Sequence, residues 1–585
     1  MQEILKKIKE NSWIVALVAI VIFSFILDMY VLTRYNISYG RDGPFYDFQV
    51  LSILQTGLPA SNDPPLAYYI LTPFVILSGN SFLGIKIGMA LIGSLMAFPA
   101  YFLTETFRKK INIDSKVPAL LSAFLMTVNP FYFSMIGDFM QNLIGVFFLL
   151  LLMYFAVKWF ENTKEWKKYG ILTLILLLCC IFTHIYTGIL AVILFLSLLI
   201  FSLIFRTYKT GKMPGLDLKI VLAAAVLIIG GLGALFIIYP VMFSKFTTVL
   251  SFVNNSSTET SNFRGGMTAN PLVFLTIPFI FGIIATLKIF YGGLKEKINP
   301  QNWKINKKML LALIYIVITV VVIILSTFPS IDSQYQGRFI MLIFVPIALM
   351  VPLGLKLIEE WVSGKYESKD GLKLALVIIA VLFAVSSLYT TSSTISSMGP
   401  SITTEQYNEL VKIKADHLNG KIDPSGIIVV SDYHMGYWVQ YVTGMHVETG
   451  NTADVLSKYP DSKIYAVTLT QNSQMGSGMG QSYSWNPLFP YSFPFGGINI
   501  QNSNEKQDGI GNAPDQISKN NMTGPPSNLG NSTRFKSGST LPNMGNMTQN
   551  NGMGSQQMPT QGSNQPLSNS GTLIYSSDNL KVYKI

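Results

Sequence analysis

Long apolar runs separated by short polar stretches dominate the first two thirds of the chain. A helix of about 20 apolar residues is long enough to cross a hydrocarbon core of about 30 Å. The repeated runs predict about eleven membrane-spanning helices, at residues 13–33, 82–106, 117–136, 141–160, 169–184, 186–205, 218–243, 270–290, 309–328, 339–357 and 372–391. The apolar piece at 66–78 is too short to cross, and we expect a half-helix or an interfacial helix there.

The last third of the chain replaces the long apolar runs with short helix and strand signals. Helix signals occur at 403–418, 435–442 and 451–459, and strand signals occur at 426–431, at 463–468 and twice within 571–585. We therefore expect an α/β domain over 400–470 plus 571–585. The stretch 471–570 is mostly Asn, Gln, Ser, Gly, Pro and Met, so it predicts a low-complexity, disordered insertion. Residues 1–392 are the predicted transmembrane domain, with an outer loop at 34–80.

Composition and charge agree with a multi-pass membrane protein. Only 12% of the residues are charged and 50% are hydrophobic, with a mean hydropathy of +0.41; a soluble protein carries roughly twice as many charges. The net charge of +11 does not indicate nucleic-acid binding, because Lys and Arg cluster in alternate loops, as membrane insertion requires. This bias predicts a cytoplasmic N-terminus and an extracytoplasmic C-terminal domain. Cys179 and Cys180 are adjacent in an apolar run and predict neither a disulfide framework nor a metal site.

Ionisable residues gather on the outer face that this topology predicts. The candidates for a functional site are Arg41, Asp42, Asp47, Lys86, Asp138, His184 and Arg338. Charged groups near membrane depth are costly, so they mark functional sites by default. Each also has a plainer explanation, because an Asp can cap a turn, a His can be a hydrogen-bonded interfacial residue, and a Lys or Arg can anchor a helix at the interface.

Together these residues suit the transfer of a group from a lipid phosphate. Arg338, helped by Arg41 or Lys86, can hold the phosphate, whose departure needs cations rather than a general acid. A carboxylate beside the acceptor can remove or orient its proton. Alternatively, Asp42 and Asp138 can share a divalent metal ion that keeps part of its water, as Mg²⁺ or Mn²⁺ prefers.

Several segments, taken in order, resemble the GT-C superfamily of membrane glycosyltransferases. GRDGPFYDF at 40–48 and PPLAYYI at 64–70 are similar to the first outer loop of protein O-mannosyltransferases and aminoarabinose transferases. GDFMQNLIG at 137–145 is similar to the second acidic motif of oligosaccharyltransferase catalytic subunits, except that Gln141 and Asn142 stand where that family has a further acidic residue. GRFIMLIFVPIAL at 337–349 resembles the late Arg-Phe span of these families, and SDYHMGYWVQY at 431–441 is similar to the Trp-Trp-Asp-Tyr-Gly region, without its Trp-Trp-Asp core.

The resemblance implies roles for individual residues. Asp42 would be the base, with Asp47 nearby, and Asp138 would line the pocket. Arg338 would hold the lipid phosphate, with His184 beside it. The side chains over the acceptor groove would be those of Tyr433, His434 and Trp438.

We therefore expect a multi-pass membrane glycosyltransferase with the GT-C fold and an extracytoplasmic α/β domain. Its donor would be a sugar carried on a polyprenyl or dolichyl phosphate, and its acceptor a protein, lipid or glycan outside the cytoplasm. Two other classes stay open. A lipid-linked saccharide transporter would need a polar path and paired repeats with broken helices. A membrane receptor or scaffold would leave Asp42 and Arg338 unexplained.

Overall fold

Apolar runs that must satisfy their backbone polar groups inside lipid fold as helices, and these helices make up most of the chain. The computed structural model describes residues 11–61, 63–110, 115–161, 165–211, 275–295, 307–327, 333–363, 369–431, 433–469 and 571–585, with single positions between 222 and 237. All of these described residues belong to one compact unit.

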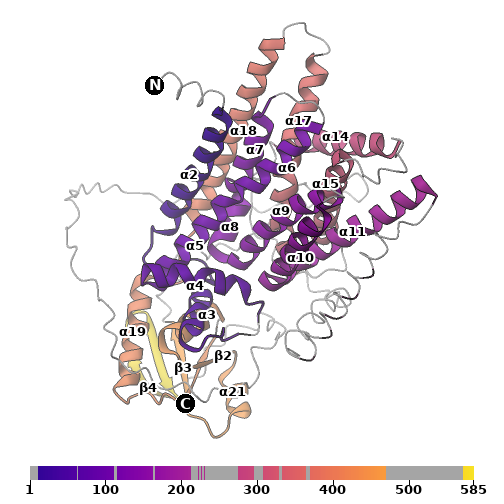
Figure 1. Cartoon of the computed structure of the whole chain (residues 1–585). Helices are drawn as coiled ribbons and strands as arrows, with labels where there is room; N and C mark the ends of the chain where they lie inside the picture. Colours follow the sequence, from indigo (N-terminus) through magenta and orange to yellow (C-terminus); the bar gives the residue numbers. More distant parts are fainter. Residues whose placement is uncertain are drawn as a thin grey trace, which may run out of the picture. The chain divides into compact units, whose positions relative to one another are not determined.

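Figure 1 labels most of the helices that precede the C-terminal sheet. Their bounds are α2 Ser12–Leu32, α3 Gly43–Thr56, α4 Leu66–Ser78, α5 Ser81–Leu95, α6 Ala97–Lys110, α7 Val117–Thr127, α8 Pro130–Asp138, α9 Met140–Glu161, α10 Trp166–Thr183, α11 Ile185–Thr210, α14 Thr276–Lys295, α15 Lys307–Thr327, α16 Ser333–Ile340, the short 3₁₀ helix η2 Met341–Ile343, α17 Phe344–Ser363 and α18 Lys369–Ser397.

Eight helices among the described residues are long and apolar enough to cross a membrane. The bent pair α7 and α8, which meet at 41°, adds a ninth if it counts as one span. These nine correspond to nine of the eleven predicted spans. The run predicted at 169–184 forms α10, and most of the run predicted at 218–243 lies outside the described residues. The piece at 66–78 forms the 13-residue helix α4, as expected.

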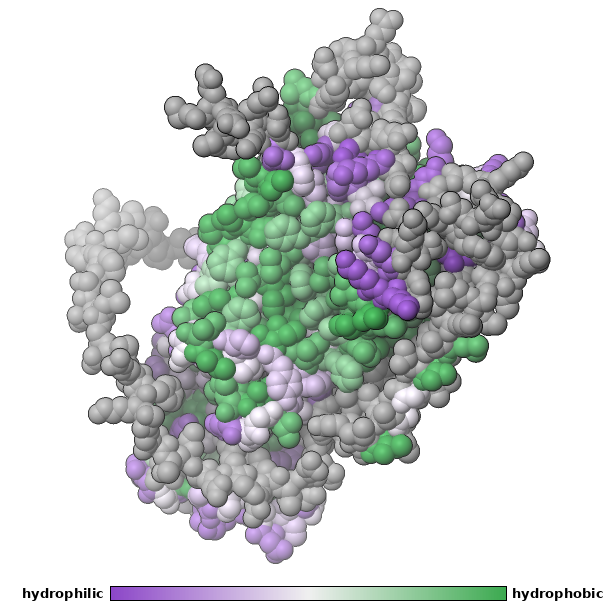
Figure 2. All heavy atoms as spheres, viewed as in Figure 1, coloured by the Kyte–Doolittle hydropathy of each residue, from purple (hydrophilic) through white to green (hydrophobic). Residues whose placement is uncertain are grey.

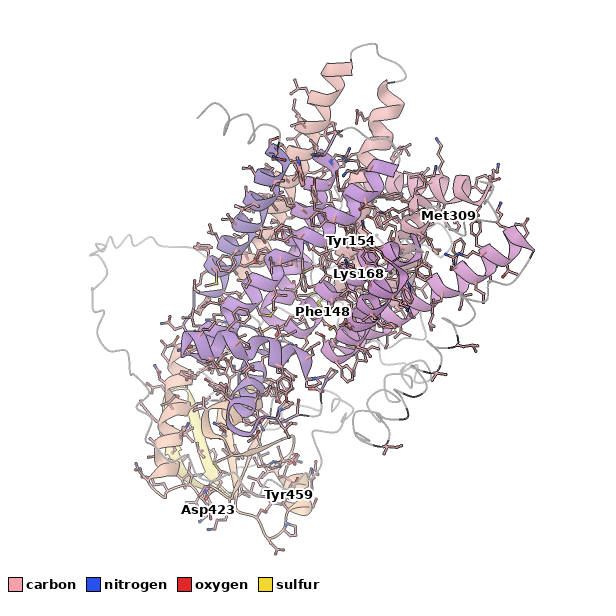
Figure 3. The ribbon with its side chains drawn as sticks, viewed as in Figure 1. Phe148, Tyr154, Lys168, Met309, Asp423 and Tyr459 are labelled. Atoms are coloured by element: carbon pink, nitrogen blue, oxygen red, sulfur yellow. The ribbon has the colours of Figure 1, made fainter. Side chains whose placement is uncertain are left out.

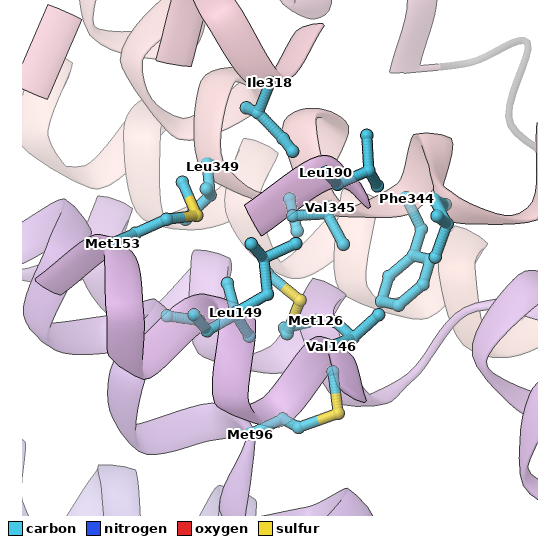
Figure 4. Packing of buried hydrophobic residues seen from close by; sticks show 14 of the residues in the cluster. Met96, Met126, Val146, Leu149, Met153, Leu190, Ile318, Phe344, Val345 and Leu349 are labelled. Atoms are coloured by element: carbon cyan, nitrogen blue, oxygen red, sulfur yellow. The ribbon is translucent and has the colours of Figure 1, made fainter. Parts of the chain in front are cut away.

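The helices pack around one large apolar core. Figure 4 shows its centre, where Met96 follows α5, Met126 comes from α7 and Leu149 from α9. Leu190 of α11 and Phe344 of α17 meet them there. Helix α2 buries only 22% of its apolar window, as α18 does, and Figure 2 shows hydrophobic residues on its outward face. A helix whose outward face is apolar over its whole length suits contact with lipid.

The C-terminal part folds as a mixed α/β structure. Its elements are α19 Thr404–Leu418, β1 Ile427–Val430, α20 Tyr433–Thr443, β2 His446–Thr449, α21 Thr452–Lys458, β3 Ile464–Leu469, β4 Thr572–Ser576 and β5 Leu580–Lys584. The sheet order is β2-β1-β3-β5-β4, with β1 parallel to both neighbours and β5 antiparallel to both of its own. The predicted helices and strands are all present. Strand β2 was not predicted, because it is four residues long and three of the four are polar.

Ion pairs and hydrogen bonds cover the surface of this α/β part. Lys463 pairs with Asp423, and Glu448 accepts hydrogen bonds from Lys458 and from the Tyr459 hydroxyl. Figure 3 labels Asp423 and Tyr459 in this region. Such a surface suits water rather than lipid. The division of the chain into a transmembrane domain, an α/β domain and an insertion stays a prediction.

The loop between α2 and α3 is fixed from both ends. Arg34 donates from Nη2 to the carbonyl groups of Ile395 and Met398, at the end of α18, at 2.6 and 3.1 Å. Gly40 then forms a bridge with Pro400, and its N–H donates to the carbonyl of Gly399 at 3.1 Å. The loop between α2 and α3 is therefore held by the segment that leads into the α/β part.

Candidate functional site

Asp138 holds the backbone of the loop that carries Asp42. The carboxylate Oδ1 of Asp138, at the end of α8, accepts hydrogen bonds from the N–H groups of Arg41 at 2.6 Å and Asp42 at 3.1 Å. Gly40 makes this approach possible. Its φ is +69°, and a Cβ placed on it would lie 2.6 Å from Asp138 Oδ1 and 2.6 Å from the carbonyl oxygen of Gly137. Only a glycine fits this position without displacing the end of α8.

The side chain of Asp42 shares its surroundings with a second carboxylate and two guanidinium groups. Burial and the Asp138 carboxylate raise the pKa of Asp42 while Arg338 and Arg41 lower it, and together these effects bring the pKa to about 7. Asp63 is close enough to contribute in the same direction as Asp138. The sequence-predicted residues Asp42, Asp138, Arg41 and Arg338 are thus brought together. A carboxyl group with a pKa near neutrality suits general base catalysis.

Arg338 lies between two aromatic rings. Its guanidinium carbon is 6.0 Å from the centre of the Phe139 ring and 5.5 Å from that of Tyr186. Its Nη1 also donates to the Tyr186 hydroxyl at 3.3 Å. Phe139 directly follows Asp138, so the carboxylate and the ring against which the cation packs belong to adjacent residues. Aromatic faces hold a guanidinium in place without neutralising its charge.

His184 shapes the turn from which Tyr186 projects. It is the N-cap of α11, and its Nδ1 accepts a hydrogen bond from the N–H of Tyr186 at 3.3 Å. A ring nitrogen that accepts a hydrogen bond carries no proton, so this contact favours a neutral imidazole with its proton on Nε2. The rings of His184 and Tyr186 are 5.0 Å apart. We therefore assign His184 a role in orienting Tyr186, and Arg338 supplies the positive charge.

Asp47 and Lys86, also predicted at the site, form a second cluster. Lys86 donates from Nζ to the carbonyl oxygens of Tyr35 at 2.6 Å and Ile37 at 2.9 Å. Asp47 is fully buried, and neither of its oxygens has a hydrogen bond within the described part of the chain. Burial raises the pKa of Asp47 to about 7, although the hydroxyl groups of Ser38 and Ser81 and the ammonium of Lys86 lower it. Lys86 thus holds the loop that precedes Asp42, and its role in binding phosphate stays a prediction.

The three predicted acceptor residues all lie in α20. Trp438 has no exposed surface, packs in the core of the α/β part and donates from Nε1 to the Ser401 hydroxyl at 2.9 Å. A side chain buried in this way packs the fold and has no surface for an acceptor, so we assign Trp438 a packing role. Tyr433 and His434 begin the helix, and their side chains lie outside the described part of the structure. Tyr437 is closer to the site, because its ring centre is 5.1 Å from that of Phe45 in α3.

Sequence reasoning missed Phe139, Tyr186 and Gln141. Gln141 donates from Nε2 to the carbonyl of Pro64 at 3.1 Å and so holds the segment after Asp63 against α9. A signal for all three was present, because each lies within three residues of Asp138 or His184. What the sequence lacks is the pairing of Arg338 with elements more than 150 positions earlier.

Asp42 and Asp138 are the carboxylates that would hold a divalent cation. Asp138 Oδ1 is already engaged by two N–H groups, which leaves its second oxygen and those of Asp42 as donors. Within the described ranges, no three His, Cys, Asp or Glu side chains form a metal-binding group. Two carboxylates with retained water fit Mg²⁺ or Mn²⁺, the ions that the sequence suggested.

Comparisons with known proteins agree with this architecture. Residues 62–243, less than half of the chain, match the family model described as dolichyl-phosphate-mannose-protein mannosyltransferase. No match is found among curated proteins.

Solved structures give matches that extend over most of the chain. The oligosaccharyltransferase of Archaeoglobus fulgidus, crystallised with a tethered acceptor peptide that contains an NVT sequon, is 15% identical, with a TM-score of 0.53 over 77% of this chain and 69% of that one. The same organism's enzyme AglB, in complex with an inhibitory peptide and a dolichol-phosphate, is 13% identical, with a TM-score of 0.53 over 78% and 69% of the two chains. The predicted resemblance is confirmed at the level of the fold: this chain is a membrane protein with the GT-C fold.

Proposed function

We propose that the protein transfers a sugar from a polyprenyl- or dolichyl-phosphate donor to an acceptor on the extracytoplasmic face of the membrane. The observation that carries the proposal is the convergence of Asp42, Asp138 and Arg338. The matched family is described by the words dolichyl-phosphate-mannose-protein mannosyltransferase, and the structure of the A. fulgidus enzyme has been solved in complex with a dolichol-phosphate. These descriptions support a lipid-linked donor for this chain.

Arg338 would bind the phosphate of the donor. Its guanidinium offers several N–H donors in a rigid plane, and the rings of Phe139 and Tyr186 fix that plane. When the bond between sugar and phosphate breaks, negative charge grows on the phosphate. A cation that is already in position stabilises this charge at the moment of transfer.

Asp42 would accept or orient the proton of the acceptor. Its pKa of about 7 leaves a substantial fraction of the carboxylate form at neutral pH, with more basicity than an ordinary Asp has. Asp138 would hold the backbone beneath it through the two N–H contacts. If a metal ion is used, Asp42 and Asp138 would hold it, and it would supply additional positive charge at the phosphate.

The proposal is tested with purified full-length protein in liposomes. Radiolabelled dolichyl-phosphate mannose is the first donor, followed by other polyprenyl-phosphate sugars, and transfer is measured for the wild type, Asp42→Asn and Arg338→Gln. Asp461→Asn, which changes an exposed carboxylate in the α/β part, is the matched control. We expect the two site variants to lose at least 100-fold in rate, roughly the loss of about 3 kcal/mol of transition-state stabilisation, and the control to keep full activity.

Two outcomes would contradict the proposal. Wild-type protein that transfers sugar from none of the donors would favour a transporter or a scaffold. Full activity in Asp42→Asn would remove that carboxylate from the mechanism.

Labelling of a cysteine introduced at Ser425, which is exposed, with a reagent that cannot cross the membrane tests the side on which the α/β part lies. Protection of that cysteine in intact cells would overturn the extracytoplasmic assignment.

A further inference from the structure

A buried polar pair lies inside the membrane-spanning part, away from the candidate site. The Tyr132 hydroxyl of α8 donates to Asp28 Oδ2 of α2 at 2.6 Å, and both side chains have no exposed surface. The second oxygen of Asp28 has no hydrogen bond within the described part of the chain. An acidic residue in a spanning helix is costly and rare. Since two apolar side chains could pack at this contact, the presence of a carboxyl and a hydroxyl group calls for a structural explanation.

The Tyr132 side chain reaches Asp28 beside a glycine of a third helix. Helix α2 packs on α5, and Tyr132 passes beside Gly93 of α5. A Cβ on Gly93 would lie 2.1 Å from the Tyr132 hydroxyl oxygen. Since no side chain fits beside that hydroxyl, Gly93 opens the space that the hydrogen bond requires.

The two helices joined by this pair lead to the two halves of the candidate site. Helix α8 ends at Asp138, less than two turns after Tyr132. Helix α2 ends at Leu32 and continues into the loop that carries Asp42. The Tyr39 hydroxyl donates to the carbonyl of Val31, which ties that loop back to the end of α2. The pair is therefore connected to Asp138 through helix α8 and to the Asp42 loop through the end of α2.

The start of α8 is fixed at the same place. Asn129 caps the helix, with its Oδ1 accepting from the N–H of Tyr132 at 2.9 Å. Its Nδ2 donates to the carbonyl of Leu125 in α7, also at 2.9 Å. The ring of Tyr132 thus starts from a defined backbone position. A short hydrogen bond at its far end then fixes α8 along the direction of α2.

We propose that Asp28 and Tyr132 are positioning residues that set the placement of Asp138 against the loop of Asp42. The contact that they protect is the pair of hydrogen bonds from Arg41 N–H and Asp42 N–H to Asp138 Oδ1. The Arg41 bond measures 2.6 Å and the Asp42 bond 3.1 Å, so a shift of α8 away from the loop by about 1 Å would lengthen both beyond hydrogen-bonding distance. This inference rests on the proposed function only for the catalytic meaning of that placement.

Amide hydrogen exchange measures the placement without any substrate. In full-length protein reconstituted in lipid, the amides of Arg41 and Asp42 are expected to exchange about tenfold faster in Tyr132→Phe than in the wild type. Tyr101→Phe is the matched control, because Tyr101 is also fully buried and its hydroxyl has no hydrogen bond within the described ranges. It should leave the exchange of this loop unchanged. Unchanged exchange in Tyr132→Phe, or equal acceleration in both variants, would overturn the proposal.

A second variant keeps the test open if Tyr132→Phe does not fold. Gly93→Ala displaces the hydroxyl without removing it, so it should accelerate the same two amides. In the double variant with Tyr132→Phe, the alanine should add little, because the hydrogen bond is already gone. If the effects of the two substitutions on amide exchange simply add, the proposal is wrong.

Turnover separates this inference from the proposed function. Tyr132→Phe should lower kcat for dolichyl-phosphate mannose at least fivefold with KM unchanged, whereas Asp28→Asn, which keeps an acceptor oxygen, should lose less. If the wild type does not transfer sugar, the proposed function is wrong. The exchange experiment still tests whether Asp28 and Tyr132 position Asp138. A change in KM alone would contradict a role in placing the two carboxylates.

Discussion

The approach of the Asp42 loop to Asp138 depends on Gly40, and Gly40→Ala is the sharpest perturbation that the structure offers. The substitution adds a single methyl group at a backbone φ of +69°. That methyl group would lie 2.6 Å from both Asp138 Oδ1 and the carbonyl oxygen of Gly137. Both atoms belong to the end of α8, so the loop and the helix end must separate.

The expected cost has two parts. An L-residue in the left-handed region costs about 1–2 kcal/mol. Loss of one hydrogen bond to a charged acceptor, here the one from Arg41 or Asp42, adds about 1.5–3 kcal/mol. The total cost to the folded state is about 2.5–5 kcal/mol. Only the lost hydrogen bond acts on the placement of Asp42, and each 1.36 kcal/mol corresponds to a factor of ten in rate. We therefore expect a loss of about 10- to 150-fold in transfer rate.

Gly79→Ala is the matched control. Gly79 follows α4 with a φ of +65°, and a Cβ there would meet no atom within 4 Å. The control therefore carries the same backbone strain without the collision. Both variants are assayed for transfer from dolichyl-phosphate mannose and for thermal unfolding in detergent. Gly40→Ala should lose activity while Gly79→Ala stays within a few-fold of the wild type. Equal activities in the two variants would refute the reasoning.

The remaining predictions concern the charged groups. The pKa of Asp47 is raised from 3.8 to about 7, so the folded state binds more protons than the unfolded state between these pH values. The free energy of unfolding therefore falls as pH rises through that window, by about 4 kcal/mol in total. Asp47→Asn should therefore gain stability relative to the wild type between pH 4.5 and pH 8 in thermal unfolding, and it should keep transfer activity; an activity loss like that of Asp42→Asn would place Asp47 in the mechanism. Arg338→Lys should retain less than a tenth of the wild-type rate, because a lysine cannot reproduce the planar contact with Phe139 and Tyr186, and wild-type kinetics in this variant would exclude that contact. If Asp42 and Asp138 hold a metal ion, EDTA should abolish transfer and Mn²⁺ or Mg²⁺ should restore it, whereas EDTA resistance would leave Arg338 as the main cation.

The helices and most strands could be predicted from the sequence because their signals are local. An apolar run of sufficient length, or a short alternation of apolar and polar residues, depends on no distant partner. The bend between α7 and α8 follows from Asn129 and Pro130, a cap and a first-turn proline. Strand β2 depends on pairing with β1, and its own four residues carry too weak a pattern.

The candidate site was only partly predictable. Asp42 and Asp47 look alike in the sequence, but five residues along a helix turn the side chain by about 140°, so the two carboxylates point in different directions. Asp42 therefore joins Asp138, while Asp47 joins Lys86 in a buried cluster. The packing of Arg338 against Phe139 and Tyr186 joins separate helices, and no local pattern encodes it.

The dependence of the first outer loop on the end of α18 has a consequence for biosynthesis. The partners of Arg34 lie 361 and 364 positions later in the chain, and the partner of Gly40 is Pro400, so these contacts form only after those residues are synthesised. At a synthesis rate of about 5–20 residues per second, this interval lasts roughly 20–70 s. A nascent chain in the membrane would thus carry an unfinished loop until its last span is inserted. Premature termination anywhere before that point should yield an inactive protein, so activity itself reports that translation has passed α18.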